Sequence, residues 1–169
     1  MSRRALLPSV LVRSVLVRSV LTGSVLAASA LAGCGQSSPP EVTFTVEDRS
    51  ATTGPIRHCD VELTECEEND SAVAVLRVPP GQPVQISVPE SVAQTPWQVV
   101  FRYRKGAEQV GGRSEVFPPG GQQDYTLRVP EGGALESLEV QQYGAPALAA
   151  GGESSFRIRA AWVLAAEGR

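Results

Sequence analysis

From residue 41 onward the sequence predicts an all-β domain, and two observations support this. Apolar residues alternate with polar ones at a period of two in most segments, which is the spacing of half-buried strands. Clusters of Pro and Gly separate these segments at intervals of about a dozen residues, as in sandwiches and barrels. About 130 residues suffice for one hydrophobic core, so a single domain is expected.

The alternating pattern predicts nine strands, of which the first two lie ahead of the main set. Residues 42–46 and 59–63 alternate cleanly, whereas the nearly unbroken apolar run at 73–78 predicts a strand covered on both faces or lying between the core and another segment. The other strands are expected at 84–88, 97–104, 116–117, 125–129, 138–142 and 156–164. Among the connections, the loops most available for recognition are Glu90–Thr95, Lys105–Arg113 and Gly144–Gly152.

From residue 72 onward, the order of features follows that of an immunoglobulin-like sandwich. The segment Gly81–Val88 resembles strand B of that fold, and Trp97 stands where strand C supplies a buried tryptophan. The two core cysteines of antibody domains are replaced, the first by Ile86 or Val88 and the second by Val140. The expected fold is an immunoglobulin-like antiparallel β-sandwich with additional N-terminal strands, an architecture that implies no particular activity.

The first 33 residues have the composition of a lipoprotein signal peptide. Arginines precede an apolar run from Val20 to Ala32, which is shorter than the roughly 20 residues of a transmembrane helix. Leu31-Ala32-Gly33-Cys34 resembles a lipobox, so cleavage would leave Cys34 at the amino terminus for lipidation. We expect a signal peptide at 1–33, a lipidated tether at 34–40 and a β-sandwich domain at 41–169. The alternative is an ordinary secreted protein that is cut nearby, with Cys34 as a spare thiol.

The charge of the mature chain restricts its partners. Cleavage would remove four of the 15 basic residues and none of the 18 acidic ones, leaving a formal charge of −7. An acidic domain argues against nucleic acid or an anionic lipid surface as an electrostatic partner. We expect the protein at the extracytoplasmic face of the cell membrane, held by its lipid anchor, with another envelope protein or a glycolipid as further partner.

Two cysteines remain in an oxidising compartment, and this predicts a disulfide between Cys59 and Cys66. Seven residue steps of extended strand would span roughly 23 Å, whereas bridged Cα atoms lie within about 6.8 Å. The chain must therefore turn back between Val61 and Cys66. The spacing matches neither a redox motif nor a zinc-ligand pattern.

Catalysis is not expected, because the single histidine lacks partners in any known motif. His58 adjoins an acidic segment from Asp60 to Asp70, but the chain has neither a nucleophile elbow nor an H-E-x-x-H string. We therefore expect no enzyme activity and no cofactor. The acidic segment lacks the spacing of an EF-hand loop, so a solvated turn is expected, with calcium binding as the alternative.

Four arginines are the candidate binding residues. Arg102 and Arg104 on strand C, and Arg157 and Arg159 on strand G, would flank Glu139 on strand F if the sheet order is C, F, G. Opposite charges on neighbouring strands support pairing, so a salt-bridge ladder on a wet face is expected. The alternative is a patch for an anionic envelope glycolipid or another partner.

Two tryptophans and one polar segment complete the candidate residues. Trp97 and Trp162 lie on the apolar side of their strands, which favours core packing over a carbohydrate-stacking platform. The segment Gln141–Tyr143 fits either a corner of the sandwich or a contact site.

Five sequence blocks occur together with the Cys59 and Cys66 pair. They are Ala72–Pro79, Thr95–Phe101, Tyr125–Pro130, Glu139–Gly144 and Ala161–Leu164. On these blocks the chain, from lipobox to final strand, resembles a family of actinobacterial secreted lipoproteins catalogued only as a domain of unknown function. The resemblance implies a location outside the cytoplasm and no particular chemistry.

The leading expectation is a non-enzymatic lipoprotein of the cell envelope that binds or organises something outside the membrane. The alternative is a carrier or sensor of a small ligand, such as an envelope glycolipid or a metal ion. That ligand would lie in a cleft between the N-terminal strands and the sandwich.

Overall fold

The computed structural model describes residues 38–130, 132–144, 147–148 and 154–167. The predicted signal peptide, Cys34 and most of the predicted tether lie outside these residues. Among the described residues, no helix is long and apolar enough to cross a membrane.

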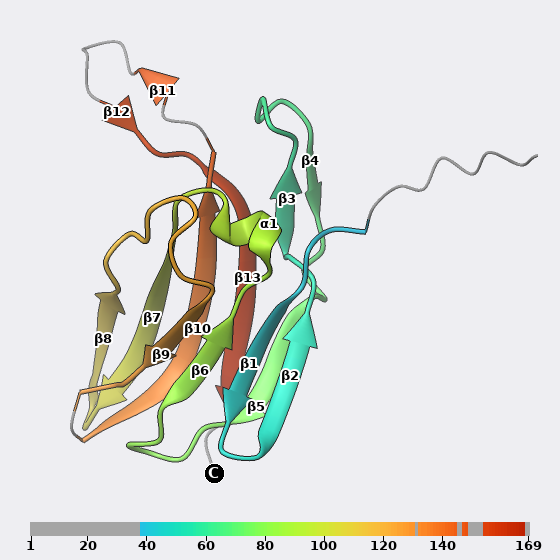
Figure 1. Cartoon of the computed structure of the whole chain (residues 1–169). Helices are drawn as coiled ribbons and strands as arrows, with labels where there is room; N and C mark the ends of the chain where they lie inside the picture. The colour runs from blue at the N-terminus through green and yellow to red at the C-terminus, as the bar shows by residue number, and fades with distance from the viewer. Residues whose placement is uncertain (1–37, 131, 145–146, 149–153, 168–169) are drawn as a thin grey trace, which may run out of the picture. The chain divides into compact units, whose positions relative to one another are not determined.

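Two sheets make up the domain (Figure 1). The smaller, which we call sheet A, has the strand order β2-β1-β6-β9. The larger, sheet B, has the order β4-β3-β13-β10-β7-β8, and β5 also pairs with β13. Sheet A comprises β1 (Val42–Val46), β2 (Arg49–Thr53), β6 (Val84–Ser87) and β9 (Asp124–Leu127). Sheet B comprises β3 (Arg57–Cys59), β4 (Cys66–Glu68), β5 (Val73–Arg77), β7 (Trp97–Lys105), β8 (Glu108–Arg113), β10 (Gly133–Tyr143) and β13 (Ile158–Glu167). The remaining elements are the one-turn helix α1 (Glu90–Ala93) and the short pair β11 (Ala147–Leu148) and β12 (Ser154–Ser155).

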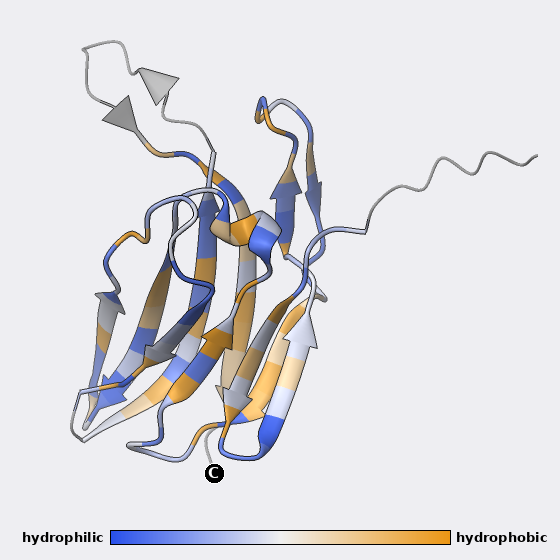
Figure 2. Cartoon of the chain, viewed as in Figure 1, coloured by the Kyte–Doolittle hydropathy of each residue, from blue (hydrophilic) through white to orange (hydrophobic). Residues whose placement is uncertain are grey.

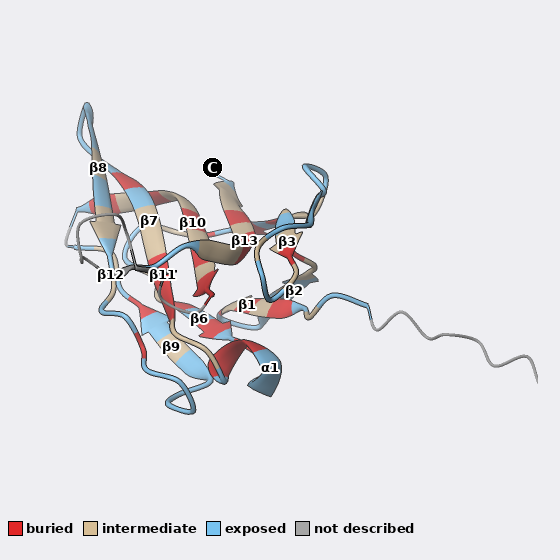
Figure 3. Ribbon diagram, turned by 90° about the horizontal axis from the view of Figure 1, so that it is seen from above, coloured by how far each residue is buried: buried red, intermediate tan, exposed pale blue. Residues whose placement is uncertain are grey.

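The core lies between the two sheets and takes alternate residues from each strand. Phe44 and Ile86 from sheet A are fully buried, as are Trp97 and Trp162 from sheet B. The hydropathy colouring shows the corresponding alternation along the strands (Figure 2), and buried segments occur in both sheets and in α1 (Figure 3). These observations confirm the all-β sandwich, and both tryptophans belong to its core.

The order of the central strands of sheet B is also as predicted. Strands β7, β10 and β13, which the sequence analysis labelled C, F and G, are neighbours. The far edge of β13 is shared, because β3 pairs antiparallel near its start and β5 pairs parallel near its end. Strand β13 therefore joins the hairpin of β3 and β4 to the rest of sheet B.

The strand predicted at 59–63 is wrong beyond Cys59. Residues 60–65 form a turn in which Asp60 Oδ1 accepts the backbone N–H of Thr64 at 2.7 Å, and Leu63 has a positive φ of 59°. Asp side chains that bond to nearby backbone N–H groups compete with strand pairing. Alternation alone could not reveal this, and Val61, expected on a half-buried strand, is 65% exposed. Five strands were also missed, β2, β4, β8, β11 and β12, and the strand predicted at 116–117 is only an isolated bridge between Phe117 and Trp97.

Three further expectations need correction. The strand at 73–78 is not covered on both faces, because Val75 is 50% exposed while its neighbours Ala74 and Leu76 are buried. Most of the loop expected at Lys105–Arg113 is strand β8, paired with β7. The loop expected at Glu90–Thr95 contains α1, whose Val92 is fully buried. Most of the predicted loop Gly144–Gly152 lies outside the described residues.

Candidate binding surfaces

The structure separates the four candidate arginines into two places. Arg102 lies opposite Ser137 in the middle of β10, whereas Arg159 lies beside the far end of that strand, near Gln142. Five to six residues of strand separate the two levels, which is roughly 17–20 Å. Arg157 is exposed beyond them. The four side chains therefore do not form one patch around Glu139.

Arg104 has a structural partner that the sequence analysis did not identify. Glu136 is an extra residue on β10, between the pairs Leu135↔Tyr103 and Ser137↔Arg102, so it forms a β-bulge. Its carboxylate forms an ion pair with Arg104 and accepts a hydrogen bond from Gln109 Nε2 at 2.5 Å. These two contacts, the one from Gln109 first, hold the pKa of Glu136 below its usual value. Arg104 is therefore engaged within the sheet.

The first candidate site is an open groove of about 540 Å³ over the outer face of sheet B, which we call the sheet groove. Its floor crosses three strands, because Val100, Glu139 and Val163 lie in one row and point to the same face. The next row contains Arg102, which lies between Gly111 and Ser137. Gly111 has no side chain and Ser137 has a small one, so both leave space for the groove. The residues that line the groove are Val100, Phe101, Arg102, Gly111, Gly112, Arg113, Ser137, Leu138, Glu139 and Val163.

A row of hydrogen-bonded side chains continues from the floor of the sheet groove. Glu139 Oε1 accepts Gln141 Nε2 at 3.0 Å, and Gln141 Oε1 accepts the Tyr143 hydroxyl at 3.0 Å. Gln98 Nε2 donates to Gln141 Oε1 at 3.3 Å and also contacts the Tyr143 hydroxyl. Burial raises the pKa of Tyr143, and the hydrogen bond from Gln98 opposes this rise. The row orders Glu139 but leaves it half-buried at the groove.

Gln142 points the other way and has a structural role. Its side chain is only 2% exposed and donates to Ser91 O at 3.2 Å and to Thr95 Oγ1 at 2.9 Å. Both acceptors lie in or beside α1, so Gln142 fixes that helix against β10. The sequence left the role of the segment Gln141–Tyr143 open. Gln141 and Tyr143 belong to the hydrogen-bonded row beside the sheet groove, whereas Gln142 does not.

The second candidate site lies where the chain enters the sandwich, and we call it the entry cleft. Two adjoining cavities, of about 400 and 260 Å³, share Ser38, Pro39, Glu41 and His58 as lining residues. Trp162 Nε1 donates to Pro40 O at 2.9 Å and so holds the entering chain beside the core. The larger cavity adds Pro40, Pro89, Ser91, Gln142 and Arg159, and the smaller adds Gly54, Pro55, Glu67, Glu68 and Asn69.

A second bulge directs Arg159 into this cleft. On β13 the pairing passes from Ala160 to Ile158 while β10 advances one residue, from Gln142 to Tyr143, so Arg159 has no partner on β10. Such an extra residue re-aims its side chain. Arg159 Nε donates to Cys59 O at 3.2 Å, which places the guanidinium against the hairpin of β3 and β4.

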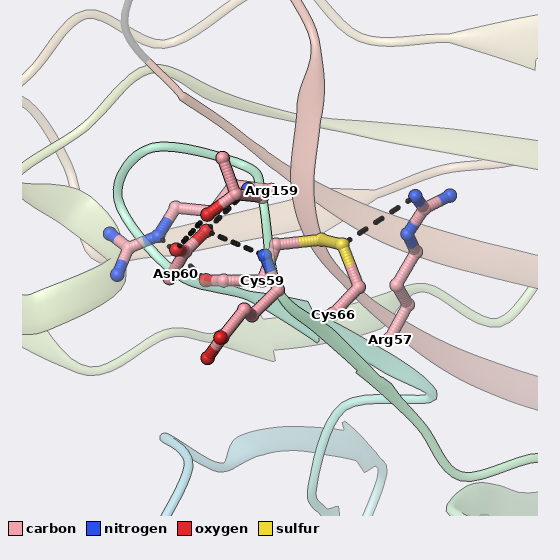
Figure 4. Close-up of a disulfide and its surroundings, with 7 residues drawn as sticks. Arg57, Cys59, Asp60, Cys66 and Arg159 are labelled. Atoms are coloured by element: carbon pink, nitrogen blue, oxygen red, sulfur yellow. Dashed lines mark hydrogen bonds between the residues drawn. A yellow bond between two sulfur atoms is a disulfide. The ribbon is translucent and has the colours of Figure 1, made fainter.

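The hairpin of β3 and β4 forms one wall of the entry cleft. Cys59 and Cys66 are opposite each other in the hairpin and form the predicted disulfide. Figure 4 shows Arg57 and Arg159 on opposite sides of this bridge. Arg57 Nη2 lies 3.8 Å from Cys66 Sγ, and Arg159 contacts the Cys59 carbonyl. The disulfide constrains a hairpin that pairs with β13 through only two residue pairs.

His58 lies in the entry cleft, in an environment that disfavours its charge. Burial lowers its pKa from the usual value, Arg159 lowers it further, and Glu67 acts in the opposite direction.

In the part of the chain that the structure describes, no group of three or more His, Cys, Asp or Glu side chains could hold a metal ion. Asp60, in the acidic segment, uses its carboxylate on the backbone and hydroxyl of Thr64.

The sequence analysis included Gly111 and Arg113 only as part of a loop available for recognition, and it did not identify Val163 or Glu41 as site residues. A glycine inside a strand often marks a place where something approaches the backbone closely, so Gly111 carried a usable signal once β8 was known to be a strand. Arg113 and Val163 carried no comparable signal, because their position depends on pairing between distant strands.

Comparison with known proteins places the chain in a family. Its relatives include "Uncharacterized protein Rv0875c" of Mycobacterium tuberculosis and "Uncharacterized protein Mb0899c" of Mycobacterium bovis, each 30% identical over 105 residues. These alignments cover 60% of this chain and 62% of each relative. No solved structure matches the chain significantly. A family model described as "Protein of unknown function (DUF2771)" matches residues 35–165, and the chain therefore belongs to that family.

Proposed function

We propose that this protein is a non-catalytic binding module of the cell envelope, with an immunoglobulin-like sandwich tethered outside the membrane by a lipid on Cys34. The basic and apolar leader with its lipobox supports the tether. The observation that carries the binding role is the sheet groove, an open hollow of about 540 Å³ on the central strands of sheet B.

The sheet groove has the chemistry of a contact surface. The water-facing side of an antiparallel sheet is usually polar, yet Val75, Val100 and Val163 all lie on this face. Arg102 and Arg113 stand beside them and are exposed. An apolar centre with arginine nearby is typical of protein interfaces. The partner that fits best is a protein segment presenting an apolar side chain next to a carboxylate.

Substitution of Gly111 tests this role without altering the core. A side chain built on Gly111 meets nothing within 4 Å, so Gly111→Val is expected to fill part of the groove while the melting temperature stays nearly unchanged. A photo-crosslinking amino acid at Val75, in intact cells, should form a protein adduct that Gly111→Val reduces at least tenfold. The matched control is Thr126→Val, which adds an exposed methyl group on sheet A.

Two results would contradict this role of the groove. One is an adduct that is unaffected by Gly111→Val. The other is equal reduction by Gly111→Val and Thr126→Val, which would indicate a nonspecific effect of added apolar surface.

The tether has a separate test, because Cys34 lies outside the described residues. Intact-protein mass spectrometry of native material should show a chain that begins at residue 34 and carries diacylglycerol and acyl groups. Cys34→Ser should shift the protein from the membrane fraction to the soluble fraction. The variant cannot carry the acyl chains that would anchor it. An unmodified Cys34 with the leader still attached would refute the proposed location.

The entry cleft supports a second candidate function, carriage or sensing of a small ligand. Its two cavities lie where the chain enters the sandwich, and Glu41 lines both of them while Arg159 lines the larger. Their combined lining mixes polar and apolar residues and carries both signs of charge. A small polar ligand therefore fits this site better than an apolar one.

A further inference from the structure

The two cavities of the entry cleft differ in charge. The larger is lined by Arg159 and Ser91, which offer hydrogen-bond donors, and by Gln142, whose amide N–H groups already bond to Ser91 O and Thr95 Oγ1. The smaller is lined by Glu67 and Glu68 together with Asn69. The cleft therefore has one half that contains Arg159 and an adjoining half that is more acidic.

Glu41 and His58 line both cavities and so connect the two halves. His58 is opposite Glu67 on the hairpin and opposite Ala160 on β13, which places it between the halves. Its depressed pKa, caused by burial and then by Arg159, leaves the ring mainly neutral at pH 7. An anion bound beside it would favour the charged ring and raise that pKa.

Arg159 is positioned to receive an anion. Among the described residues, its one hydrogen bond is from Nε–H to the Cys59 carbonyl. The guanidinium carries four further N–H donors. Its planar, forked geometry suits phosphate oxygens. The Nε bond fixes the side chain beforehand, which lowers the entropic cost of binding.

We propose that the entry cleft binds the zwitterionic phosphoethanolamine headgroup of a membrane phospholipid. The phosphate lies against Arg159 and His58, and the primary ammonium lies against the carboxylates of Glu41 and of Glu67, the residue opposite His58 on the hairpin. The larger cavity, of about 400 Å³, is within the size range of small-molecule sites, and the smaller, of about 260 Å³, adjoins it.

The lining residues also discriminate against other headgroups. A quaternary ammonium such as choline is usually recognised by an aromatic cage, whereas the ring of His58 is the single aromatic side chain among the residues that line the two cavities. A purely anionic headgroup, such as phosphoglycerol, would meet the carboxylates of Glu41 and Glu67 with no cation of its own to offset them. The order of preference is therefore phosphoethanolamine before phosphocholine and phosphoglycerol.

That the ligand comes from the membrane rests on the tether proposed at Cys34. That the cleft binds phosphoethanolamine does not depend on the tether. Ser38 lines both cavities and lies four residues after Cys34. Four extended residue steps span at most about 14 Å. An acyl chain on Cys34 would therefore hold the rim of the cleft close to the headgroups of the bilayer.

A titration of the processed full-length protein in dodecyl maltoside tests the cleft. Glycerophosphoethanolamine, followed by its ³¹P resonance, should show saturable broadening and bind at least tenfold more tightly than glycerophosphocholine or glycerophosphoglycerol. It should also raise the pKa of His58, followed by NMR. Arg159→Gln and Glu67→Gln should each weaken binding at least tenfold. The matched controls Arg157→Gln and Glu65→Gln, which alter exposed residues outside the lining, should leave it unchanged.

Glu67→Gln keeps the test decisive even if Arg159→Gln disturbs the hairpin, because Glu67 is exposed. The proposal falls if the wild type binds none of the three compounds, if it binds all three equally, or if Glu67→Gln binds as tightly as wild type. Binding of free glycerophosphoethanolamine without any preference for phosphatidylethanolamine nanodiscs would overturn the lipid as source.

The test also separates this proposal from the tether. An unmodified Cys34 with selective binding intact would refute the tether and the lipid as source, and would support the cleft as a site for phosphoethanolamine compounds. An acylated Cys34 without selective binding would refute the cleft and support the tether.

Discussion

Trp162→Ala is expected to lower the free energy of unfolding by about 3–5 kcal/mol, the range for truncating a buried large aromatic residue. Trp162 has no exposed surface and lies on β13, the strand that pairs with β10, β3 and β5. The change would leave a cavity at the centre of sheet B and remove the N–H that binds Pro40 O. Urea denaturation followed by far-UV circular dichroism measures the loss.

Two companion variants separate the causes of this loss. Trp162→Phe keeps an aromatic ring but removes the donor to Pro40 O, so it should cost less than alanine while increasing hydrogen exchange at Glu41. Val61→Ala changes an apolar residue that is 65% exposed, and should stay within about 0.5 kcal/mol of wild type. A loss below about 1 kcal/mol for Trp162→Ala would show that the residue is not part of the core.

Phe44→Ala is expected to cost a similar amount, about 3–5 kcal/mol. Phe44 lies on β1, the strand between β2 and β6 in sheet A, and is fully buried. The sequence analysis treated this segment as an addition ahead of the sandwich. In the structure β1 is part of the single core, so its truncation should destabilise the whole domain. Far-UV circular dichroism and tryptophan fluorescence should then report one coincident unfolding transition.

Ser50→Ala serves as the control on the neighbouring strand. Ser50 lies on β2, is exposed, and shares a hydrogen bond of 2.9 Å with Thr45 Oγ1. Its loss should change stability by less than about 1 kcal/mol, because water can replace an exposed partner. If Phe44→Ala instead produced two separate transitions, β1 and β2 would form an independent unit beside the sandwich.

The strands that the sequence predicted well share one property. In β1 and β6, one face is buried and the other is more open, so the side-chain period of two appears directly in the residue order. The prediction failed at 59–63, where Asp60 bonds to Thr64 and turns the chain although the apolar alternation continues. A local hydrogen bond of this kind outweighs a weak strand preference.

The candidate sites were harder to predict for a different reason. Two bulges, at Glu136 and at Arg159, change which way side chains point by adding one residue to one strand of a pair. A shift of one residue moves a side chain to the other face. The arginines expected in one ladder therefore serve separate ends of sheet B, with Arg104 bound to Glu136 and Arg159 directed to the entry cleft.

The residue order alone determined the all-strand class, the core tryptophans, the disulfide pair and the family resemblance, because each depends on local period, composition or short blocks. Only the tertiary structure decided that Val100, Glu139 and Val163 share one floor and that Arg159, His58 and Glu67 line one cleft. These groupings join segments up to a hundred residues apart. They follow from strand register and bulges, which long-range packing sets and local sequence does not.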